Sequence, residues 1–501
     1  MHTGYRDQLG LSHYDILSGS EILGSHLENH VREKGKIELL DNTISKKDID
    51  VLRALGYTEF GYARHNLRRK AWHIILRSQY VAEHNDKIQS TAKTVTHKDE
   101  KQIELDVNRS FNNLKNGPQR AYLRKVLQKL LIRFFRSNSE LSYYQGFHDV
   151  LSIFILVFLN YDDDNTGEHV IYKVENIESL FYCVEAFSLL YLRDFLMPTL
   201  DFSIDQLKVI QNYILNKDEE LYEKMQLDVI HPLYAISSVL TVFAHELKPT
   251  VDDQSHEIFE VFDMIISSQS MFLPLKIYAT LFLQFKSDII TTYEVNIENF
   301  ENEADLIHCV IQQVIQKNLY SHEIHNESFI NAIKKVRLAK ASEYTLTNVS
   351  DMVNVYSPLV TTARGESQLF TSEEINEIVG KQLIYHNKQQ QLKIQAKERL
   401  LKPKSKHINS MLSIIGGHGS ISPLIKASIA VAIVAILLRM NKNKRIIAGI
   451  STGKEFIGEI KHLHSSIFYS LKNSYWKDPL KIVLHTYKKL QNQLSSSDFE
   501  R

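Results

Sequence analysis

Apolar residues recur along most of this chain at the spacing of one helical face. From residue 48 they follow the i, i+3, i+4 pattern typical of an amphipathic helix, at Ile49, Leu52 and Leu55 and then, after Gly56, at Leu67, Ala71, Trp72, Ile75 and Leu76. Residues 121–135 repeat the pattern, whereas residues 150–159 are apolar on nearly every side and predict a buried helix. Further helical periods occupy residues 177–192, 204–215, 233–245, 258–266 and 275–285. No alternation persists long enough to predict a sheet, so the expected fold class is all-α.

The same pattern divides the chain into segments of different character. Residues 1–47 form an N-terminal extension, residues 48–300 a multi-helix domain and residues 301–341 its helical continuation. Residues 342–420 are polar and rich in lysine, with three glutamines in a row at 389–391, which predicts a linker that contains a charged helix. Residues 441–501 form a C-terminal tail, in which residues 475–494 have the pattern of an amphipathic helix.

Residues 421–440 form an apolar stretch of a different kind. They carry charge only at Lys426 and Arg439, near the two ends. A helix of this length rises about 30 Å, which matches the hydrocarbon core of a bilayer. We therefore predict a transmembrane or membrane-inserted helix, although the uncharged centre, residues 427–438, is short enough to leave a core helix or an in-plane segment open. Basic residues flank both ends, so the charge pattern leaves the topology undecided.

Composition limits the classes of function. The 501 residues, 44% of them hydrophobic, suffice for a sizeable core and for two or three folding units. The 59 basic residues balance 59 acidic ones, so we expect no nucleic-acid partner. The two cysteines, Cys183 and Cys309, lie in apolar helical contexts, as reduced thiols of a cytosolic protein do. The first residues lack a secretory signal pattern, so we expect the helical domain to face the cytosol.

Two short strings carry candidate chemistry. Residues 103–109 read Ile-Glu-Leu-Asp-Val-Asn-Arg. Helical spacing places Asp106 beside Arg109, so its carboxylate can hold the guanidinium in position. A guanidinium can bind two phosphate oxygens at once through bidentate hydrogen bonds. Residues 143–146 read Tyr-Tyr-Gln-Gly. The carboxamide of Gln145 can accept a hydrogen bond from a water and donate another at the same time. Gly146 allows a close turn before the buried helix. A guanidinium and a water-orienting carboxamide are the groups that a slow GTPase needs at its γ-phosphate.

Together with an upstream string that contains Arg68 and Trp72, these strings resemble the three signature motifs of TBC domains, which activate Rab GTPases. The resemblance covers about residues 52–285 and implies a helical fold of two subdomains. It implies that Arg109 is an arginine finger and Gln145 a glutamine finger, both acting in trans on a GTP-bound Rab. It assigns supporting roles to Asp106, Tyr143, Gly146, Asp149, Arg68 and Trp72. GTP and Mg²⁺ would then belong to the Rab, so we expect no cofactor and no metal ion in this chain.

Longer strings extend the resemblance to the TBC branch that is anchored in the endoplasmic reticulum by a C-terminal membrane segment. They lie at residues 144–150, 192–201 and 234–245. This branch implies a Rab of ER-to-Golgi traffic as substrate, and attachment to the endoplasmic reticulum or an early secretory membrane through residues 421–440. Two positions depart from the pattern, because Ser238 and Val242 stand where tryptophans are usual. We expect the consequences in local packing and in the fit to the Rab.

Two other classes of function stay open at the level of the sequence. One is a non-catalytic module that binds a Rab, against which the intact Arg109 and Gln145 argue. The other is a membrane scaffold whose functional part is the C-terminal segment. We do not expect a nucleotide-binding hydrolase, because residues 448–455 resemble a phosphate-binding loop only superficially, with Glu455 where a magnesium-binding hydroxyl is needed.

Overall fold

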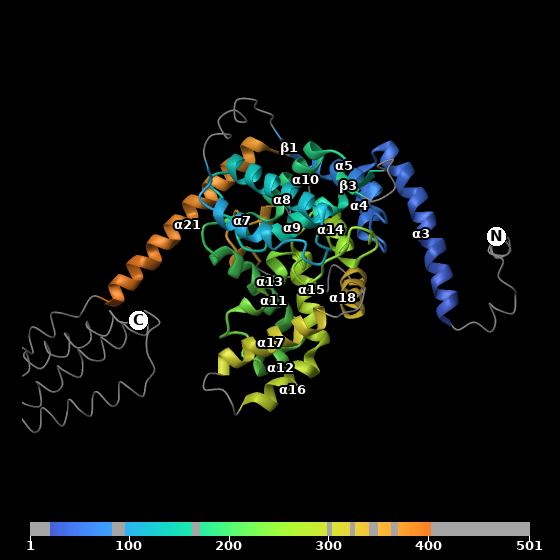
Figure 1. The fold of residues 1–501 in the computed structure, drawn as a ribbon. Coiled ribbons are helices and arrows are strands. Elements are labelled where there is room, and N and C mark those ends of the chain that lie inside the picture. The colour runs from blue at the N-terminus through green and yellow to red at the C-terminus, as the bar shows by residue number, and fades with distance from the viewer. Residues whose placement is uncertain are drawn as a thin grey trace, which may run out of the picture. The chain divides into compact units, whose positions relative to one another are not determined.

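Figure 1 shows the fold in a computed structural model, which describes residues 21–82, 96–162, 171–297, 303–320, 326–339, 349–361 and 369–401. The chain divides into two compact units, residues 1–383 and residues 384–501. Both candidate strings and nearly all of the described elements belong to the first unit. The division into two helical subdomains that the resemblance implies stays a prediction, because residues 1–383 form a single compact unit.

Helices make up most of the described part of the first unit. Its N-terminal half contains α3 (Glu21–Lys46), α4 (Ile49–Tyr57), α5 (His65–Arg77), α7 (Glu100–Asn108), α8 (Pro118–Ser137), α9 (Phe147–Val157), α10 (Ile177–Tyr191) and the 3₁₀ helix η2 (Arg193–Leu196). There follow α11 (Asp201–Lys217), α12 (Glu219–Lys224), the 3₁₀ helix η3 (Pro232–Ala235), α13 (Ile236–Leu240), α14 (Glu257–Ser268), α15 (Phe272–Gln284), α16 (Lys286–Asn296), α17 (Glu303–Leu319) and α18 (Glu327–Leu338). The last described helices are α19 (Val349–Met352), α20 (Pro358–Thr361) and α21 (Ser372–Leu401), which runs into the second unit.

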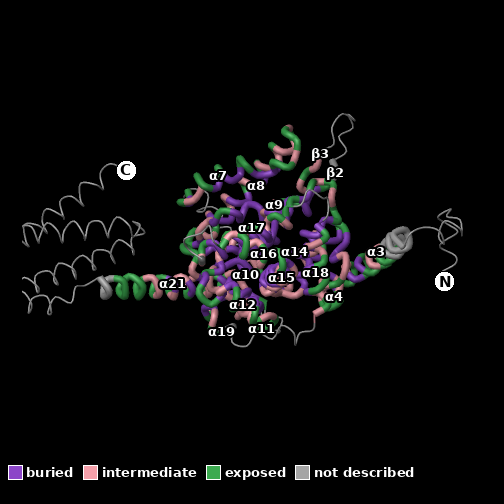
Figure 2. Tube along the Cα trace, turned by 90° about the horizontal axis from the view of Figure 1, so that it is seen from below, coloured by how far each residue is buried: buried purple, intermediate pink, exposed green. Residues whose placement is uncertain are grey.

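The hydrophobic pattern correctly locates α4, α5, α8, α9, α10, α11, α14 and α15. Helix α8 covers the amphipathic stretch at 121–135, with most of its apolar side chains buried while Lys125 and Lys129 are exposed. Helix α9 covers residues 150–157 of the run that is apolar on nearly every side, whereas Leu159 at the end of that run begins the strand β2 (Leu159–Asp162). Ser152 is the one residue of the run that is not buried. Figure 2 shows α14 and α15 as mostly buried helices as well. An all-round apolar pattern thus marks the helices at the centre of the core.

The expectation of an all-α chain is incomplete, because two short sheets are present. Strand β1 (Tyr80–Val81) pairs in parallel with β4 (Phe370–Thr371), and β2 (Leu159–Asp162) pairs antiparallel with β3 (Ile171–Val174). In the second pair Leu159 lies opposite Val174. Strands this short offer too few positions for alternating polarity to be recognised in a sequence. The domain is nevertheless mainly helical.

The predicted helix over residues 233–245 is only partly correct. Helix α13 ends at Leu240, and Val242 and Phe243 then adopt left-handed backbone angles, with φ of 51° and 64°. Both side chains are fully buried, so the apolar pattern there reflects packing into the core and not a continuing helix. The N-terminal extension also holds a long helix, α3, which the sequence pattern did not predict.

A buried ion pair joins α5 to α14. Arg68 Nε lies 3.0 Å from both carboxylate oxygens of Asp263, and the indole N–H of Trp72 donates to Asp263 Oδ1 over 2.7 Å. The backbone N–H of Tyr62 donates to Oδ2 over 2.9 Å. Arg68 is 1% exposed and Asp263 is 0% exposed. These donors compensate a carboxylate whose burial would otherwise be strongly unfavourable.

Part of the predicted linker packs into the first unit. The side chain of Asp194, which is fully buried in η2, accepts hydrogen bonds from Ser357, from Gln382 and, over 3.3 Å, from Asn354 Nδ2. The neighbouring Arg193 donates to Thr361 Oγ1 over 2.8 Å. The folded unit therefore continues beyond residue 342, where the sequence pattern predicted the linker to begin.

The predicted membrane segment, residues 421–440, lies outside the described residues, as does the amphipathic pattern at 475–494. Within the described ranges, no helix combines the length and the apolar character needed to cross a membrane. Attachment of this chain to a membrane therefore stays a prediction.

Replacing Arg68 by alanine should destabilise the first unit by about 3–5 kcal/mol, because Asp263 would stay buried without its charge partner. The urea midpoint of the full chain, followed by tryptophan fluorescence, measures this loss. Arg32→Ala is the matched control, because the Arg32–Glu59 pair, 3.0 Å apart, is exposed and such pairs contribute at most about 1 kcal/mol. Equal midpoints for the two variants would contradict the role given to the buried pair.

Candidate functional site

The first candidate residue, Arg109, caps the C-terminal end of α7 with its side chain 51% exposed. Its Nη2 lies 2.8 Å from Oδ1 of Asp106, one turn back on the helix, and the side chain of Asp106 is only 1% exposed. Gln102 donates to the same oxygen over 3.1 Å. A buried carboxylate therefore holds an exposed guanidinium at the surface of the domain.

The string at 143–146 is attached to the same carboxylate. The hydroxyl of Tyr143 donates to Asp106 Oδ2 over 2.7 Å, and the backbone N–H of Tyr143 donates to Asp99 Oδ2 over 2.9 Å. Burial and the neighbouring charge of Asp106 raise the pKa of the Tyr143 hydroxyl well above its usual range, so it remains a donor. Tyr143 and Asp106 are 37 residues apart in sequence, so the two strings meet at one carboxylate.

Gln145 is the exposed residue of its string. Tyr144 before it and Gly146 after it are both buried, which directs the loop inward on either side of the carboxamide. Gly146 has φ of +111°, and a Cβ placed there would lie 2.7 Å from Cγ2 of Thr241. Glycine is needed here for two reasons, since the backbone angle disfavours L side chains and a side chain has no room.

A second network fixes the first turn of α9, directly after Gly146. Asp149 Oδ2 lies 2.9 Å from His245 Nδ1, and Asp149 Oδ1 lies 3.5 Å from His148 Nε2 and 3.6 Å from Lys248 Nζ. Burial alone would raise the pKa of Asp149, but the hydrogen bond from His245 and the charges of His148 and Lys248 bring it below the usual range. The same bond to Asp149 raises the pKa of His245. Asp149 therefore stays ionised and paired at neutral pH.

One segment behind the loop contacts it at three places. The hydroxyl of Tyr144 donates to the backbone oxygen of Leu240 over 2.8 Å, Thr241 packs against Gly146, and His245 bonds Asp149. The sequence pattern assigns no role at the site to Leu240, Thr241 or His245. Their partners are almost a hundred residues earlier in the chain, so local spacing carries no signal for these contacts.

Comparison with known proteins identifies the family. Residues 65–290 match the Rab-GTPase-TBC domain family, and the GTPase-activating protein GYP8 of Saccharomyces cerevisiae is 35% identical over 468 residues that cover 90% of each chain. This chain belongs to the Rab-GTPase-TBC domain family. The GTPase-activating protein gyp10 of Schizosaccharomyces pombe is 30% identical over 246 residues, 48% of this chain and 59% of the relative. Human TBC1 domain family member 20 is 26% identical over 268 residues, 52% and 60% of the two chains. The resemblance to TBC domains is thereby confirmed.

The upstream string with Arg68 and Trp72 makes its side-chain hydrogen bonds elsewhere than at the two candidate strings. Among the described residues, the side-chain hydrogen bonds of Arg68 and Trp72 go to Asp263, His65 and Gln254 and not to either candidate finger. The Trp72 ring, however, packs on Phe154 of α9 with the ring centroids 4.9 Å apart. This string therefore supports the helix that begins at Gly146, and its own partner, Asp263, was missed by sequence reasoning.

The TBC domain accommodates its two departures from the family pattern differently. Ser238, in place of a tryptophan, donates its hydroxyl to Oε1 of the buried Glu246 over 2.8 Å. Val242 is fully buried with a left-handed backbone, which is strained for a β-branched residue. Both positions lie in or next to the segment that contacts the Gln145 loop, so these departures alter the surroundings of the candidate site and not its polar groups.

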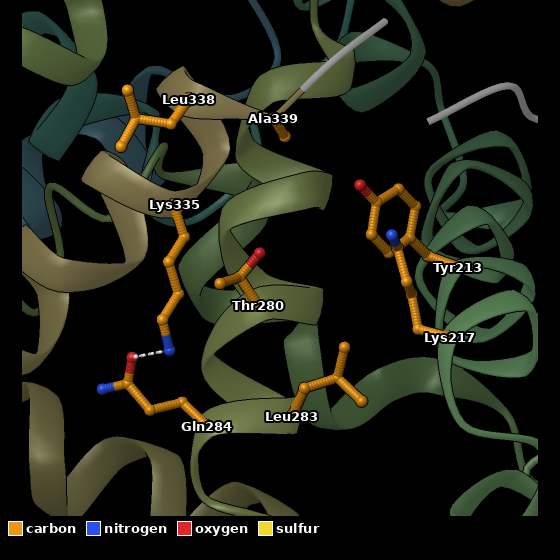
Figure 3. A pocket seen from close by; sticks show the side chains of 8 residues that line it. All are labelled: Tyr213, Lys217, Thr280, Leu283, Gln284, Lys335, Leu338 and Ala339. Carbon is orange, nitrogen blue, oxygen red and sulfur yellow. Dashed lines mark hydrogen bonds between the residues drawn. The ribbon is translucent and has the colours of Figure 1, made fainter. Parts of the chain in front are cut away.

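Figure 3 shows a hollow of the TBC domain between α11, α15 and α18, whose volume is about 470 Å³. Lys335 donates to Gln284 Oε1 over 3.5 Å at one side, and Tyr213 and Lys217 lie across from them. None of its lining residues belongs to the two networks around Asp106 and Asp149. We therefore assign no part of the candidate chemistry to this hollow.

Replacing Gly146 by alanine should destabilise the TBC domain by about 1–3 kcal/mol, because the left-handed angle and the overlap with Thr241 both act against a side chain. The urea midpoint of the full chain measures the loss. Adding Thr241→Ser should restore part of it, since serine lacks the overlapping methyl group yet keeps the hydrogen bond to the Ser237 oxygen, 2.8 Å in wild type. Thr241→Ser alone is the control. An alanine variant as stable as wild type would refute this account of Gly146.

Proposed function

We propose that this chain is a GTPase-activating protein that inserts Arg109 and Gln145 into the active site of a GTP-bound Rab. Membership of the family supports it, and so do the names of two relatives, the GTPase-activating proteins GYP8 and gyp10. The single observation that carries the proposal is the buried Asp106 carboxylate, which holds the exposed Arg109 and the string that presents the exposed Gln145.

The two side chains have complementary tasks in this mechanism. Negative charge develops on the transferred phosphoryl group of GTP, and the guanidinium of Arg109 neutralises it, an effect of about 10³–10⁵ in rate. This corresponds to about 4–7 kcal/mol of activation free energy. The carboxamide of Gln145 accepts a hydrogen bond from the attacking water and donates another, which orients the water for in-line attack. GTP and Mg²⁺ come from the Rab, so the activator holds no cofactor of its own.

Arg109→Ala should lower the activated hydrolysis rate by about 10³-fold or more, because it removes the guanidinium that neutralises the charge on the phosphoryl group. Arg109→Lys should stay strongly impaired, since a lysine cannot make the two-pronged contact. Phosphate release from a panel of GTP-loaded Rabs, with the full chain in detergent, measures both, and the panel also identifies the substrate.

Lys129→Ala, which removes an exposed cation on α8, is the matched control for charge and should behave as wild type. Gln145→Ala should lower the rate while leaving binding of the GTP-bound Rab intact. If no Rab is accelerated, or if Arg109→Ala matches wild type, the finger mechanism is wrong. Tight binding of the GTP form without acceleration would favour the alternative of a non-catalytic Rab-binding module.

A second part of the proposal concerns the membrane to which this chain attaches and the Rab on which it acts. We propose that residues 421–440 attach the chain to the endoplasmic reticulum or an early secretory membrane, with the TBC domain in the cytosol and a Rab of ER-to-Golgi traffic as substrate. The apolar sequence of this segment and its basic flanks support membrane attachment. The shared strings with the membrane-anchored branch support the place and the substrate.

Deleting residues 421–440 should release the chain from membranes, because this segment supplies the apolar length that a bilayer requires. Fractionation of cells that express the full chain, followed by a carbonate wash of the pellet, measures the release. Deletion of residues 475–494 is the control and should leave the chain in the washed pellet. A chain without 421–440 that still resists the wash would exclude this segment as the anchor.

A further inference from the structure

The loop that presents Gln145 is a tight turn of the backbone. The N–H of Phe147 donates to the oxygen of Tyr144 over 3.2 Å, which places Gln145 and Gly146 at the two central positions of a β-turn. A positive φ at the second of these positions, +111° at Gly146, is typical of one class of such turns. The exposed carboxamide therefore lies at the tip of a short turn, and its direction depends on the residues that hold the two ends of that turn.

A hydrogen bond between two side chains joins the ends of this turn. The hydroxyl oxygen of Tyr143, directly before the turn, lies 2.9 Å from Nδ1 of His148, directly after it. His148 is the second residue of α9 and is 5% exposed. Its other ring nitrogen, Nε2, lies 3.5 Å from Oδ1 of Asp149. The imidazole is therefore placed between the hydroxyl at one end of the turn and a buried carboxylate in the first turn of α9.

The available protons fix the direction of the bond between Tyr143 and His148. The hydroxyl of Tyr143 has one proton, which it donates to Oδ2 of Asp106 over 2.7 Å. Asp106 pairs with Arg109 as a carboxylate and has no proton to offer in return. The hydroxyl oxygen can therefore only accept from the ring, so Nδ1 of His148 is the protonated nitrogen and the donor. Hydrogen bonds thus run from His148 through Tyr143 to the carboxylate that holds Arg109.

The backbone that carries His148 is held firmly by the core. Phe147, its neighbour in α9, is fully buried, and its ring packs on Phe134 and Phe135 of α8 with centroids 5.4 Å and 5.7 Å apart. The hydroxyl of Ser152 donates to the backbone oxygen of His148 over 2.8 Å. Close packing leaves such a residue little freedom to move. The imidazole is therefore a fixed point to which Tyr143, and with it the turn, is bonded.

We propose that His148 is a positioning residue, which fixes the direction of the Gln145 carboxamide through its hydrogen bond to Tyr143. The proposal rests on the proposed function, because it takes Gln145 as the group that orients the attacking water. Without a donor at Nδ1, Tyr143 stays on Asp106, but the two ends of the turn are no longer bonded to each other. A displacement of about 1 Å near the reacting atoms can cost about 10²-fold in rate. The bond therefore acts on kcat and not on KM.

Three substitutions of His148 in the full chain test the position of the donor. His148→Leu removes it and should lower kcat with a GTP-loaded Rab about tenfold, with KM within about twofold of wild type. His148→Asn keeps an N–H donor bonded to Cγ, as Nδ1 is, and should restore kcat to within about twofold of wild type. His148→Gln carries the same amide one bond further out and should stay impaired. If His148→Leu fails to fold, the two amide variants still carry the test.

The Gln145→Ala background separates positioning from a general effect on the domain. With no carboxamide to direct, His148→Leu should cause little further fall in kcat. His73→Leu is the matched control, because Nδ1 of His73 also bonds a hydroxyl, that of Ser179 over 2.7 Å, and should leave kcat unchanged. The proposal is overturned if His148→Leu keeps the kcat of wild type, if His148→Asn is as impaired as His148→Leu, or if His148→Leu lowers kcat equally with and without Gln145.

Failure of this role and failure of the finger mechanism give different results. Loss of activity in Arg109→Ala with an unaltered kcat in His148→Leu retains the fingers and excludes the role of His148. Urea midpoints of Tyr143→Phe, His148→Leu and the double variant need no GTPase, and the double variant should lose less than the two single losses together. If no Rab is accelerated, the finger mechanism and the effect on kcat both fail, and coupled midpoints retain only the bond. Additive midpoints exclude the bond, and the proposal with it, whatever the Rabs show.

Discussion

The candidate site depends on one buried carboxylate, that of Asp106. A carboxylate at 1% exposure is stable as an anion only when charge and hydrogen bonds compensate its lost hydration, and Arg109, Tyr143 and Gln102 supply them. Each of these contacts also fixes its donor in space. The requirement to compensate one buried charge therefore positions the exposed guanidinium and, through Tyr143, the loop that carries the exposed amide.

The domain builds a second support from a distant part of the chain. Residues 240–250 contact the Gln145 loop through Leu240, Thr241 and His245, and they bind the loop after Arg109 through Asn113. Val242 and Phe243 hold left-handed angles within this support. Such angles persist only where surrounding packing determines them, and both side chains are fully buried. The site is thus a product of tertiary packing between two halves of the helical domain.

Local chemistry could be predicted from the sequence, and long-range partners could not. Helical spacing alone indicated that Asp106 lies beside Arg109, and the apolar periods located α8 and α9. The partner of Arg68 could not be predicted, because Asp263 is 195 residues away and any of many carboxylates satisfies the same rule. The break after Leu240 was missed for a related reason. The same apolar residue types are buried in turns and in helices, so the sequence does not distinguish the two. The backbone angles depend on the residues that pack around them.

The ion pair with Asp106 does not withdraw Arg109 from chemistry. A guanidinium has five N–H donors, and the contact with Asp106 is made at Nη2, which leaves donors for phosphate oxygens. The half-exposed side chain is already oriented by a partner that burial holds in place, so less rotational freedom is lost when a phosphate binds. An unpaired arginine at the same position would have to be ordered during docking. The ion pair between the buried Asp106 and the exposed guanidinium of Arg109 is therefore compatible with the proposed role. It also lowers the entropic cost of placing the guanidinium on a phosphate.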